Sequence, residues 1–212
     1  MLKRFLPLSL VVLALAAAPA LAEVTEGDWY LEGGLGYYIG EGDDTKTDEG
    51  FPDELEIEND YLINFRAGWF LAEDRGVEGQ LWYSETTGTR TFSATFTGGI
   101  RHIALNFDTN VYGLDVGVIF CLNPPRKHNL FVVGGVGYAN LDMSGVEDED
   151  TITVNVGLAA RISMTRHFYF RPDVRYLYLS GIDFKFREGD SKLNNILITV
   201  STGWAFGKQK EE

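Results

Sequence analysis

The sequence has 212 residues and is strongly acidic: 31 aspartates and glutamates against 18 lysines and arginines give a formal net charge of −13. Hydrophobic residues make up 45% and charged residues 23%, which excludes a wholly disordered chain. The acidic balance also excludes nucleic acid as a partner, because binding to phosphates needs a basic surface.

The first 22 residues have the layout of a cleaved secretory signal. Two basic residues precede an apolar run over 8–18, and the small-residue sequence Ala-Leu-Ala follows at 20–22. The apolar run is shorter than the ~20 residues that a membrane-spanning helix needs. We therefore expect residues 1–22 to be a signal peptide and residues 23–212 to form one domain.

Behind the signal, apolar side chains alternate with small or polar ones in eight segments. They cover residues 29–39, 60–71, 77–83, 111–122, 130–138, 152–162, 168–178 and 196–206. A period of two is typical of β-strands with one apolar face. A tilted strand crosses a membrane in roughly 9–11 residues, and most segments are about that long. A soluble sandwich alternates in the same way, so further features must decide.

Aromatic residues on the apolar faces fall into two belts. The segment ends next to short connections carry Trp29, Trp69, Phe120, Phe168, Trp204 and Phe206. The opposite ends carry Tyr37, Tyr61, Tyr83, Tyr112, Tyr138, Tyr176 and Tyr178. The belts are about eight residues apart, or ~26 Å along a strand. On tilted strands this spacing matches the apolar band of an outer-membrane barrel, so we expect the rings to form its two aromatic girdles.

The connections between segments alternate between short and long. Short ones lie at 73–75, 123–129 and 165–167, and long ones at 40–59, 84–110, 141–151 and 179–193. An up-and-down membrane barrel has this arrangement, with short periplasmic turns and longer outer loops. Residues 89–107 alternate as well. We interpret them as a hairpin that extends two neighbouring strands above the membrane; as two further membrane strands they would bring the count to ten.

The polar faces carry large ionisable side chains in equal numbers of each sign. These residues are Glu32, Glu78, Asp115, Asp173, Arg66, Arg161, Arg171 and Arg175, and glycines fill most of the rest. The interior of an eight-stranded barrel is just wide enough for side chains to fill, and buried charges must pair. We expect a plugged lumen with Glu32 beside Arg66 and Arg161 beside Asp173. Asp115 and Arg175 are expected to face each other across it.

Together these features predict an all-β fold, an eight-stranded antiparallel up-and-down transmembrane β-barrel. The chain resembles the small outer-membrane β-barrel family that includes the transmembrane domain of OmpA. The matching stretches are Val111–Gly117, Phe131–Tyr138 and Phe170–Tyr176. The resemblance implies a location in the outer membrane of a Gram-negative bacterium. It also implies that an inward acid paired with an inward base acts as a gate; the other interpretation of the eight charges is purely structural.

The closing segment, residues 198–206, is similar to the aromatic-ended strand that the outer-membrane assembly machinery recognises in such proteins. That machinery is therefore an expected partner. Outer-membrane lipid and lipopolysaccharide are the others, together with an external ligand bound through loops 40–59 and 141–151.

The first long loop is acidic, with ten acids and one base, Lys46, between Glu41 and Asp60. The third loop adds five more acids, at positions 142 and 147–150. One interpretation is a solvated loop whose like charges repel. The other is binding of Ca²⁺ or Mg²⁺, because clustered carboxylates suit these ions. No EF-hand spacing is present, so we predict no metal site and no cofactor.

The three histidines and the one cysteine decide whether catalysis is expected. His102 lies in the long second loop, where Ser93 and Asp108 are candidate partners, and His128 and His167 lie in short turns. A catalytic triad needs its members within hydrogen-bond reach, and nothing local specifies that here. Cys121 forms no intrachain disulfide because it has no second cysteine to pair with, and we interpret it as a small barrel-filling residue rather than a nucleophile or ligand.

We therefore expect no catalytic residue and no enzyme. The predicted role is a structural and surface-interacting outer-membrane barrel with a charge-paired, plugged interior. The alternatives are a narrow pore for ions or small solutes, and a hydrolase of lipid or peptide sited at the rim.

Overall fold

The structure is a computed structural model that describes residues 26–41, 43–46, 52–57, 60–96, 99–123, 128–144, 148–165, 167–182 and 191–207. The predicted signal peptide therefore lies outside the described residues. Among the described residues no helix is long and apolar enough to cross a membrane.

The described residues form ten strands. They are β1 (Trp29–Glu41), β2 (Asp43–Lys46), β3 (Pro52–Ile57), β4 (Asp60–Ala72), β5 (Arg75–Phe96), β6 (Gly99–Cys121), β7 (His128–Met143), β8 (Glu149–Ser163), β9 (Phe168–Ile182) and β10 (Ser191–Phe206).

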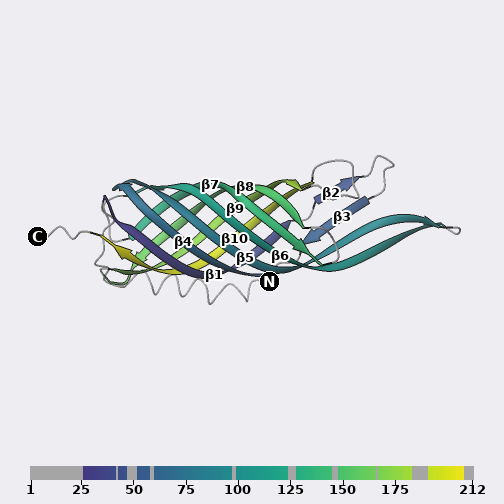
Figure 1. The fold of residues 1–212 in the computed structure, drawn as a ribbon, viewed down its shortest axis with the longest axis horizontal. Coiled ribbons are helices and arrows are strands. Elements are labelled where there is room, and N and C mark those ends of the chain that lie inside the picture. The colour runs from purple at the N-terminus through teal and green to yellow at the C-terminus, as the bar shows by residue number, and fades with distance from the viewer. Residues whose placement is uncertain are drawn as a thin grey trace, which may run out of the picture.

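Eight of the ten strands close into a barrel, drawn as a ribbon in Figure 1. β1 pairs with both β4 and β10, and pairing then continues through β9, β8, β7 and β6. β6 returns to β5, which pairs with β4, so the ring has no open edge. All these pairings are antiparallel, which confirms the predicted eight-stranded up-and-down barrel.

The alternating segment at 89–107 extends two barrel strands and adds none to the membrane count. β5 has 22 residues and β6 has 23, and the two stay paired from Arg75↔Phe120 to Phe96↔Gly99. Figure 1 shows them projecting together well beyond the end of the barrel. The hairpin interpretation is therefore confirmed, and the ten-stranded alternative is wrong.

A short hairpin of β2 and β3 inside the region 40–59 was not expected, because that region was interpreted as a loop. Glu54–Ile57 of β3 pairs with Thr91–Gly88 of β5. β4 pairs with β5 only up to Leu62↔Ser84, so β5 would otherwise leave an unpaired edge above the barrel. β3 covers part of that edge, which explains the hairpin in terms of backbone hydrogen bonding.

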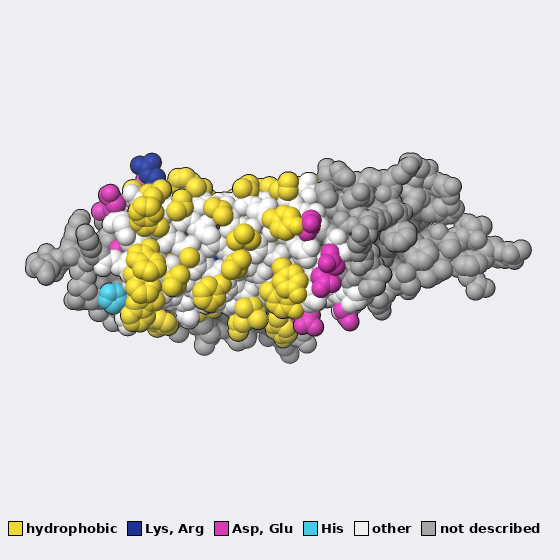
Figure 2. All heavy atoms as spheres, in the orientation of Figure 1, with side chains coloured by type: hydrophobic (Ala, Val, Ile, Leu, Met, Phe, Trp, Pro, Cys, Tyr) yellow, Lys and Arg dark blue, Asp and Glu magenta, His cyan; other side chains and the backbone are white. Residues whose placement is uncertain are grey.

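Burial alternates along every barrel strand, with the apolar face outside. Leu35, Phe65 and Val156 are 68%, 59% and 55% exposed, whereas their neighbours Asn64 and Asn155 are buried. Figure 2 shows hydrophobic side chains gathered along the wall, with acidic side chains towards both of its ends. An exposed apolar surface that encircles a closed barrel is what a bilayer covers.

The barrel interior contains two apolar layers in addition to its charges, so the prediction that glycine fills most of the remaining interior was wrong. Next to the short turns, the buried layer is formed by Tyr30, Phe70, Ile119, Cys121, Phe131, Val133, Ala159, Tyr169 and Ala205. Towards the β5–β6 extension, a second layer is formed by Tyr38, Leu62, Trp82, Val111, Ala139, Leu141, Leu177, Leu179 and Leu197. We call these the inner and outer apolar layers; the charged side chains lie between them.

Candidate functional site: the charged layer of the lumen

Four strands supply the charged layer. β1 contributes Glu32, β4 contributes Arg66 and β5 contributes Glu78, while β9 contributes three residues at alternate positions, Arg171, Asp173 and Arg175. Alternate residues of a strand point to the same side, so all three β9 side chains enter the lumen. None of the six is more than 4% exposed.

Glu78 is the most heavily bonded acid of the layer. Its carboxylate accepts hydrogen bonds from the guanidinium groups of Arg171 and Arg175. The Tyr30 hydroxyl donates a third hydrogen bond to Glu78 Oε2 at 2.6 Å. Glu78 therefore links β5 to β9 and β1 across the barrel.

Arg66 lies between the other two acids of the layer. Its guanidinium is 3.5 Å from Glu32 Oε2 and 3.6 Å from Asp173 Oδ1. It also donates hydrogen bonds to Thr199 Oγ1 at 2.8 Å and to Ser201 Oγ at 3.1 Å on β10. Glu32 and Arg66 are neighbours, as expected, because they are direct partners in the pairing of β1 with β4.

The remaining bonds join these groups into one network. Asp173 accepts from Arg175 at 2.9 Å and from Arg171 at 3.2 Å, and Arg171 also lies 3.2 Å from Glu32. Tyr169 donates to Glu32 Oε1 at 2.7 Å. Three acids and three bases therefore compensate one another, which is the condition for keeping charges in a buried interior.

One expected partnership of the lumen charges differs in the structure. The register of β8 and β9 pairs Asp173 with Ala159. Arg161 forms no salt bridge with Asp173, and its guanidinium instead lies 4.0 Å from the centroid of the Tyr169 ring. The prediction counted residues from the short-turn end of each strand, and it gave Arg161 the wrong neighbour because adjacent strands are staggered.

Asp115 and Arg175 line the same small cavity, as expected, but they are not bonded to each other. Asp115 accepts hydrogen bonds from Trp82 Nε1 at 2.7 Å and from the Thr153 hydroxyl, and within the described residues no salt bridge joins it to Arg175. Asp115, Arg175 and Glu78 line one cavity of about 10 Å³. That volume is on the order of a single water molecule. Alternation in the sequence places Asp115 inside the barrel, but it does not show that the Trp82 indole donates a hydrogen bond to it.

Glycines make room for the large interior rings. A Cβ atom added to Gly113 would collide with the Trp82 indole, and one added to Gly68 or Gly203 would collide with the Tyr30 or Tyr169 ring. The sequence analysis did not predict that interior glycines leave space for these rings. The signal was available in the sequence, because each strand that carries an inward ring has a neighbour with an inward glycine.

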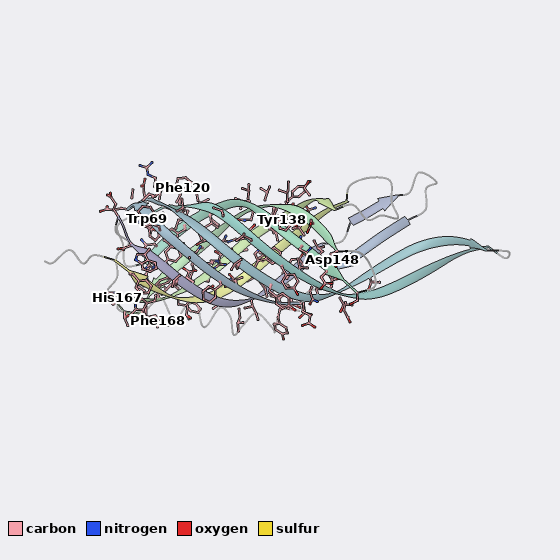
Figure 3. All side chains as sticks on the ribbon, in the orientation of Figure 1. Trp69, Phe120, Tyr138, Asp148, His167 and Phe168 are labelled. Carbon is pink, nitrogen blue, oxygen red and sulfur yellow. The ribbon has the colours of Figure 1, made fainter. Side chains whose placement is uncertain are left out.

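The residues predicted to form the two girdles all lie on the outer wall of the barrel. Figure 3 shows Trp69, Phe120 and Phe168 at the short-turn end and Tyr138 towards the opposite end. Ring pairs link adjacent strands: Trp29 stacks on Phe206 with centroids 4.5 Å apart, and Tyr83 lies 5.0 Å from Tyr112. The predicted girdle residues that are at least one-third exposed are Trp29, Tyr37, Tyr61, Trp69, Tyr112, Phe120, Tyr138, Phe168, Tyr176, Trp204 and Phe206.

Exposed acids lie at both rims of the wall, and the short-turn rim also carries one described base, Arg75. Exposed acids at the outer rim include Glu85, Asp108, Asp148 and Asp150. The basic side chains that the structure describes lie elsewhere, four in the lumen and Arg75 in the β4–β5 turn. Hydrogen bonds from Asn140 and Tyr138 hold the pKa of Asp150 below its usual range, so this carboxylate is ionised near neutral pH.

The residues weighed for catalysis and metal binding do not converge in the described part of the chain. His128 begins β7 and His167 precedes β9, both near short turns, and the side chain of His102 lies outside the described residues. No group of three or more histidine, cysteine or acidic side chains suited to a metal occurs among the described residues. Much of the acidic first loop lies outside them. Cys121 is buried and accepts a hydrogen bond from Asn129 Nδ2 at 3.5 Å.

A closed antiparallel barrel with an apolar wall, charges hidden in the lumen and short turns at one end defines an integral outer-membrane β-barrel protein. Residues 8–206 match the model of the family described as outer membrane protein beta-barrel domain, and the chain belongs to this family. The protein is accordingly placed in the outer membrane of a Gram-negative bacterium, as expected.

Solved structures of three outer-membrane proteins share the fold. OprG from Pseudomonas aeruginosa has a TM-score of 0.57 at 14% identity, covering 87% of this chain and 98% of its own. Neisserial surface protein A has a TM-score of 0.53 at 11% identity, covering 85% and 100%. Ail, the attachment invasion locus protein of Yersinia pestis, in complex with the heparin analogue sucrose octasulfate, has a TM-score of 0.51 at 17% identity, covering 86% and 100%. No curated protein sequence matches this chain.

Proposed function

We propose that this chain is a closed outer-membrane barrel with a structural and surface-interacting role, and that its outer extensions are the working surface. The observation that carries the proposal is the three-layer lumen. The charged layer lies between the two apolar layers, and the cavity beside Glu78 has room for about one water. A continuous water path would have to break several buried salt bridges at once.

The outer surface supports an interactive role. β5 and β6 carry a two-stranded extension far beyond the barrel, and β3 broadens it at one edge. The exposed acids of the outer rim favour a cationic ligand, and loops 40–59 and 141–151 are the proposed contact regions. Ail was solved with a polyanion, whereas the described rim of this chain is acidic and would repel one.

Two further partners follow from the barrel's location. The exposed apolar wall suits outer-membrane lipid and lipopolysaccharide. The strand β10 ends in Trp204 and Phe206 on the outer wall, a form suited to recognition by the outer-membrane assembly machinery. The proposal assigns no catalytic residue; release of a lipid or peptide product by the wild type, and loss of that product in His102→Ala, would contradict it.

Planar-bilayer recording tests whether the lumen is closed. Purified wild-type protein should give no discrete conductance steps, because the network is intact. The double variant Glu78→Ala/Arg175→Ala removes two large side chains that line the cavity and should give steps. Regular steps from the wild type at low voltage would overturn the closed-barrel proposal.

A gated narrow pore is the second candidate, favoured by one observation. Asp115 and Arg175 line the same small cavity without bonding to each other, so a shift of Arg175 towards Asp115 would repartner the network. If the pore is gated in this way, Asp115→Asn should give conductance steps at a different frequency from those of the wild type. Absence of conductance steps from the wild type over the full voltage range would contradict the gated-pore proposal.

A further inference from the structure

A groove runs across the outer wall over β4, β5, β6 and β7. Its volume is about 410 Å³, and it lies between two rows of outward side chains. Ile63, Tyr83, Tyr112 and Asn140 are paired neighbours in the row nearer the outer loops. All of these residues line the groove.

The second row lies two residues further into the wall on each strand. It consists of Phe65, Leu81, Leu114 and Tyr138, again successive partners in the strand register. A separation of two residues along a strand is about 7 Å. The groove is therefore a furrow between two continuous, mostly apolar rows, and each of the four side chains in the second row is about half exposed to the surroundings of the barrel.

Hydrogen bonds hold the polar ends of the groove's tyrosines in place. The Tyr83 hydroxyl donates to Asn110 Oδ1 at 2.9 Å, and its ring lies 5.0 Å from that of Tyr112. The Tyr138 hydroxyl bonds to Asp150. Walls fixed in this way are pre-organised, so binding an occupant costs little side-chain entropy.

The position of the groove identifies what surrounds it. It lies on the wall that faces the bilayer, at the level of the tyrosines and at the end from which β5 and β6 project. In this family's membrane that end is the cell exterior, because the short turns are periplasmic. The groove therefore meets the outer leaflet, and an acyl chain is the occupant that fits an apolar furrow there.

One end of the groove is polar and offers acceptors. Asn140 lines it and donates its amide to Asp150 Oδ1 at 2.9 Å, and Asp150 itself is exposed. Asp142, half-buried, lies two residues beyond Asn140 on β7. None of the basic side chains that the structure describes lies at this rim. Ionised carboxylates repel a phosphate placed directly against them but accept hydrogen bonds from hydroxyl and amide N–H groups.

We propose that this groove binds one acyl chain of lipopolysaccharide, with the sugar hydroxyl or amide groups of its lipid anchor donating to Asp150. The inference deepens the proposed lipid partnership and rests on it, but it does not depend on a closed lumen. The outer-leaflet position favours the glycolipid; phosphatidylethanolamine, whose ammonium also donates to a carboxylate, is the competing occupant that the test distinguishes. The structure thus assigns a preferred glycolipid site to one face of the wall.

Native mass spectrometry of the detergent-purified protein tests the site, with rough lipopolysaccharide added as the probe. The wild type should retain one molecule after most detergent is removed. Leu114→Trp or Leu81→Trp fills the furrow and should reduce retention at least tenfold. Val156→Trp places the same ring on an exposed wall position outside the groove and should leave retention unchanged. Heat-modified gel mobility verifies that each variant is folded.

Three results would overturn the proposal. The first is equal retention of lipopolysaccharide by wild type and both groove variants. The second is equal loss in the Val156→Trp control. The third is equal retention of phosphatidylethanolamine in a parallel titration, which would show a general lipid surface. Asp150→Asn should weaken retention of lipopolysaccharide and leave that of the phospholipid unchanged. If the wild type conducts but this pattern holds, only the closed-barrel proposal fails.

Discussion

At the scale of single residues, the charged layer is an interlocked set rather than a collection of pairs. Glu78 has two arginine partners and one tyrosine, and Asp173 has three arginines within 3.6 Å. Loss of one carboxylate therefore leaves more than one guanidinium under-compensated in a buried place.

We expect Glu78→Gln to destabilise the folded barrel by about 3–5 kcal/mol, because removing one partner of a buried ion pair has that effect. Urea unfolding of the protein in phospholipid vesicles measures the change. Glu85→Gln removes an exposed acid from the same strand and should change stability by less than about 0.5 kcal/mol. Equal effects of the two substitutions would show that the layer contributes no specific pairing.

The glycine beside Trp82 gives a second residue-scale prediction. Gly113→Ala places a methyl group against the indole that donates to Asp115, and we expect a loss of about 1–3 kcal/mol from overpacking. Gly79→Ala is the matched control, because the nearest atoms to its added Cβ are 4.0 Å away. Unfolding followed by tryptophan fluorescence compares them. A Gly113→Ala variant as stable as Gly79→Ala would contradict the role assigned to this glycine.

Which residues face the lumen was predictable from the sequence, but their partners were not. Alternation alone placed all eight charges inside. The bonding of Asp115 to Trp82, and the position of Arg161 over Tyr169, depend on the stagger between strands. The inward Tyr30, Phe70 and Phe131 were visible in the alternation, but their assembly into one apolar layer depends on barrel closure.

At the scale of elements, the pairing of β1 with β10 closes the ring. Leu35 lies opposite Val200, and Trp29 opposite Phe206, where the two rings stack. This pairing joins segments from opposite ends of the chain, so it requires all intervening strands to be in register.

Engineered cysteines test that closure. In a Cys121→Ala background, Leu35→Cys with Val200→Cys should form a disulfide on mild oxidation, because the two positions are direct partners. Leu35→Cys with Val154→Cys places the second thiol on β8, which is not a neighbour of β1, and should stay reduced. Non-reducing gels distinguish the products. A crosslink in the second variant, or its absence in the first, would refute the closing register.

The extension of β5 and β6 was predictable because residues 89–107 continue the period of two around a glycine pair. The β2–β3 hairpin was not, because its segment is short, acidic and rich in turn-forming residues, a composition that disfavours strands. Its pairing with β5 reflects the edge that β5 leaves above the barrel, a feature of the assembled fold rather than of the local sequence.

At the scale of the whole molecule, the barrel is asymmetric along its axis. Short turns and the tryptophans of the wall occupy one end, and most of its tyrosines and the projecting strands occupy the other. The number of membrane strands followed from the alternation of apolar and polar side chains. The arrangement of the lumen side chains in three layers could be stated only once the registers were known.

The central claim is that one face of every barrel strand meets lipid while the other hides in the lumen, and spin labelling in vesicles tests it most directly. In a Cys121→Ala background, nitroxides at positions 35, 116 and 156 on the apolar faces should be accessible to oxygen and shielded from a water-soluble nickel reagent. Nitroxides at the outer-rim positions 85 and 148 should show the reverse. Ready contact of the nickel reagent with labels at 35, 116 and 156 would contradict the account.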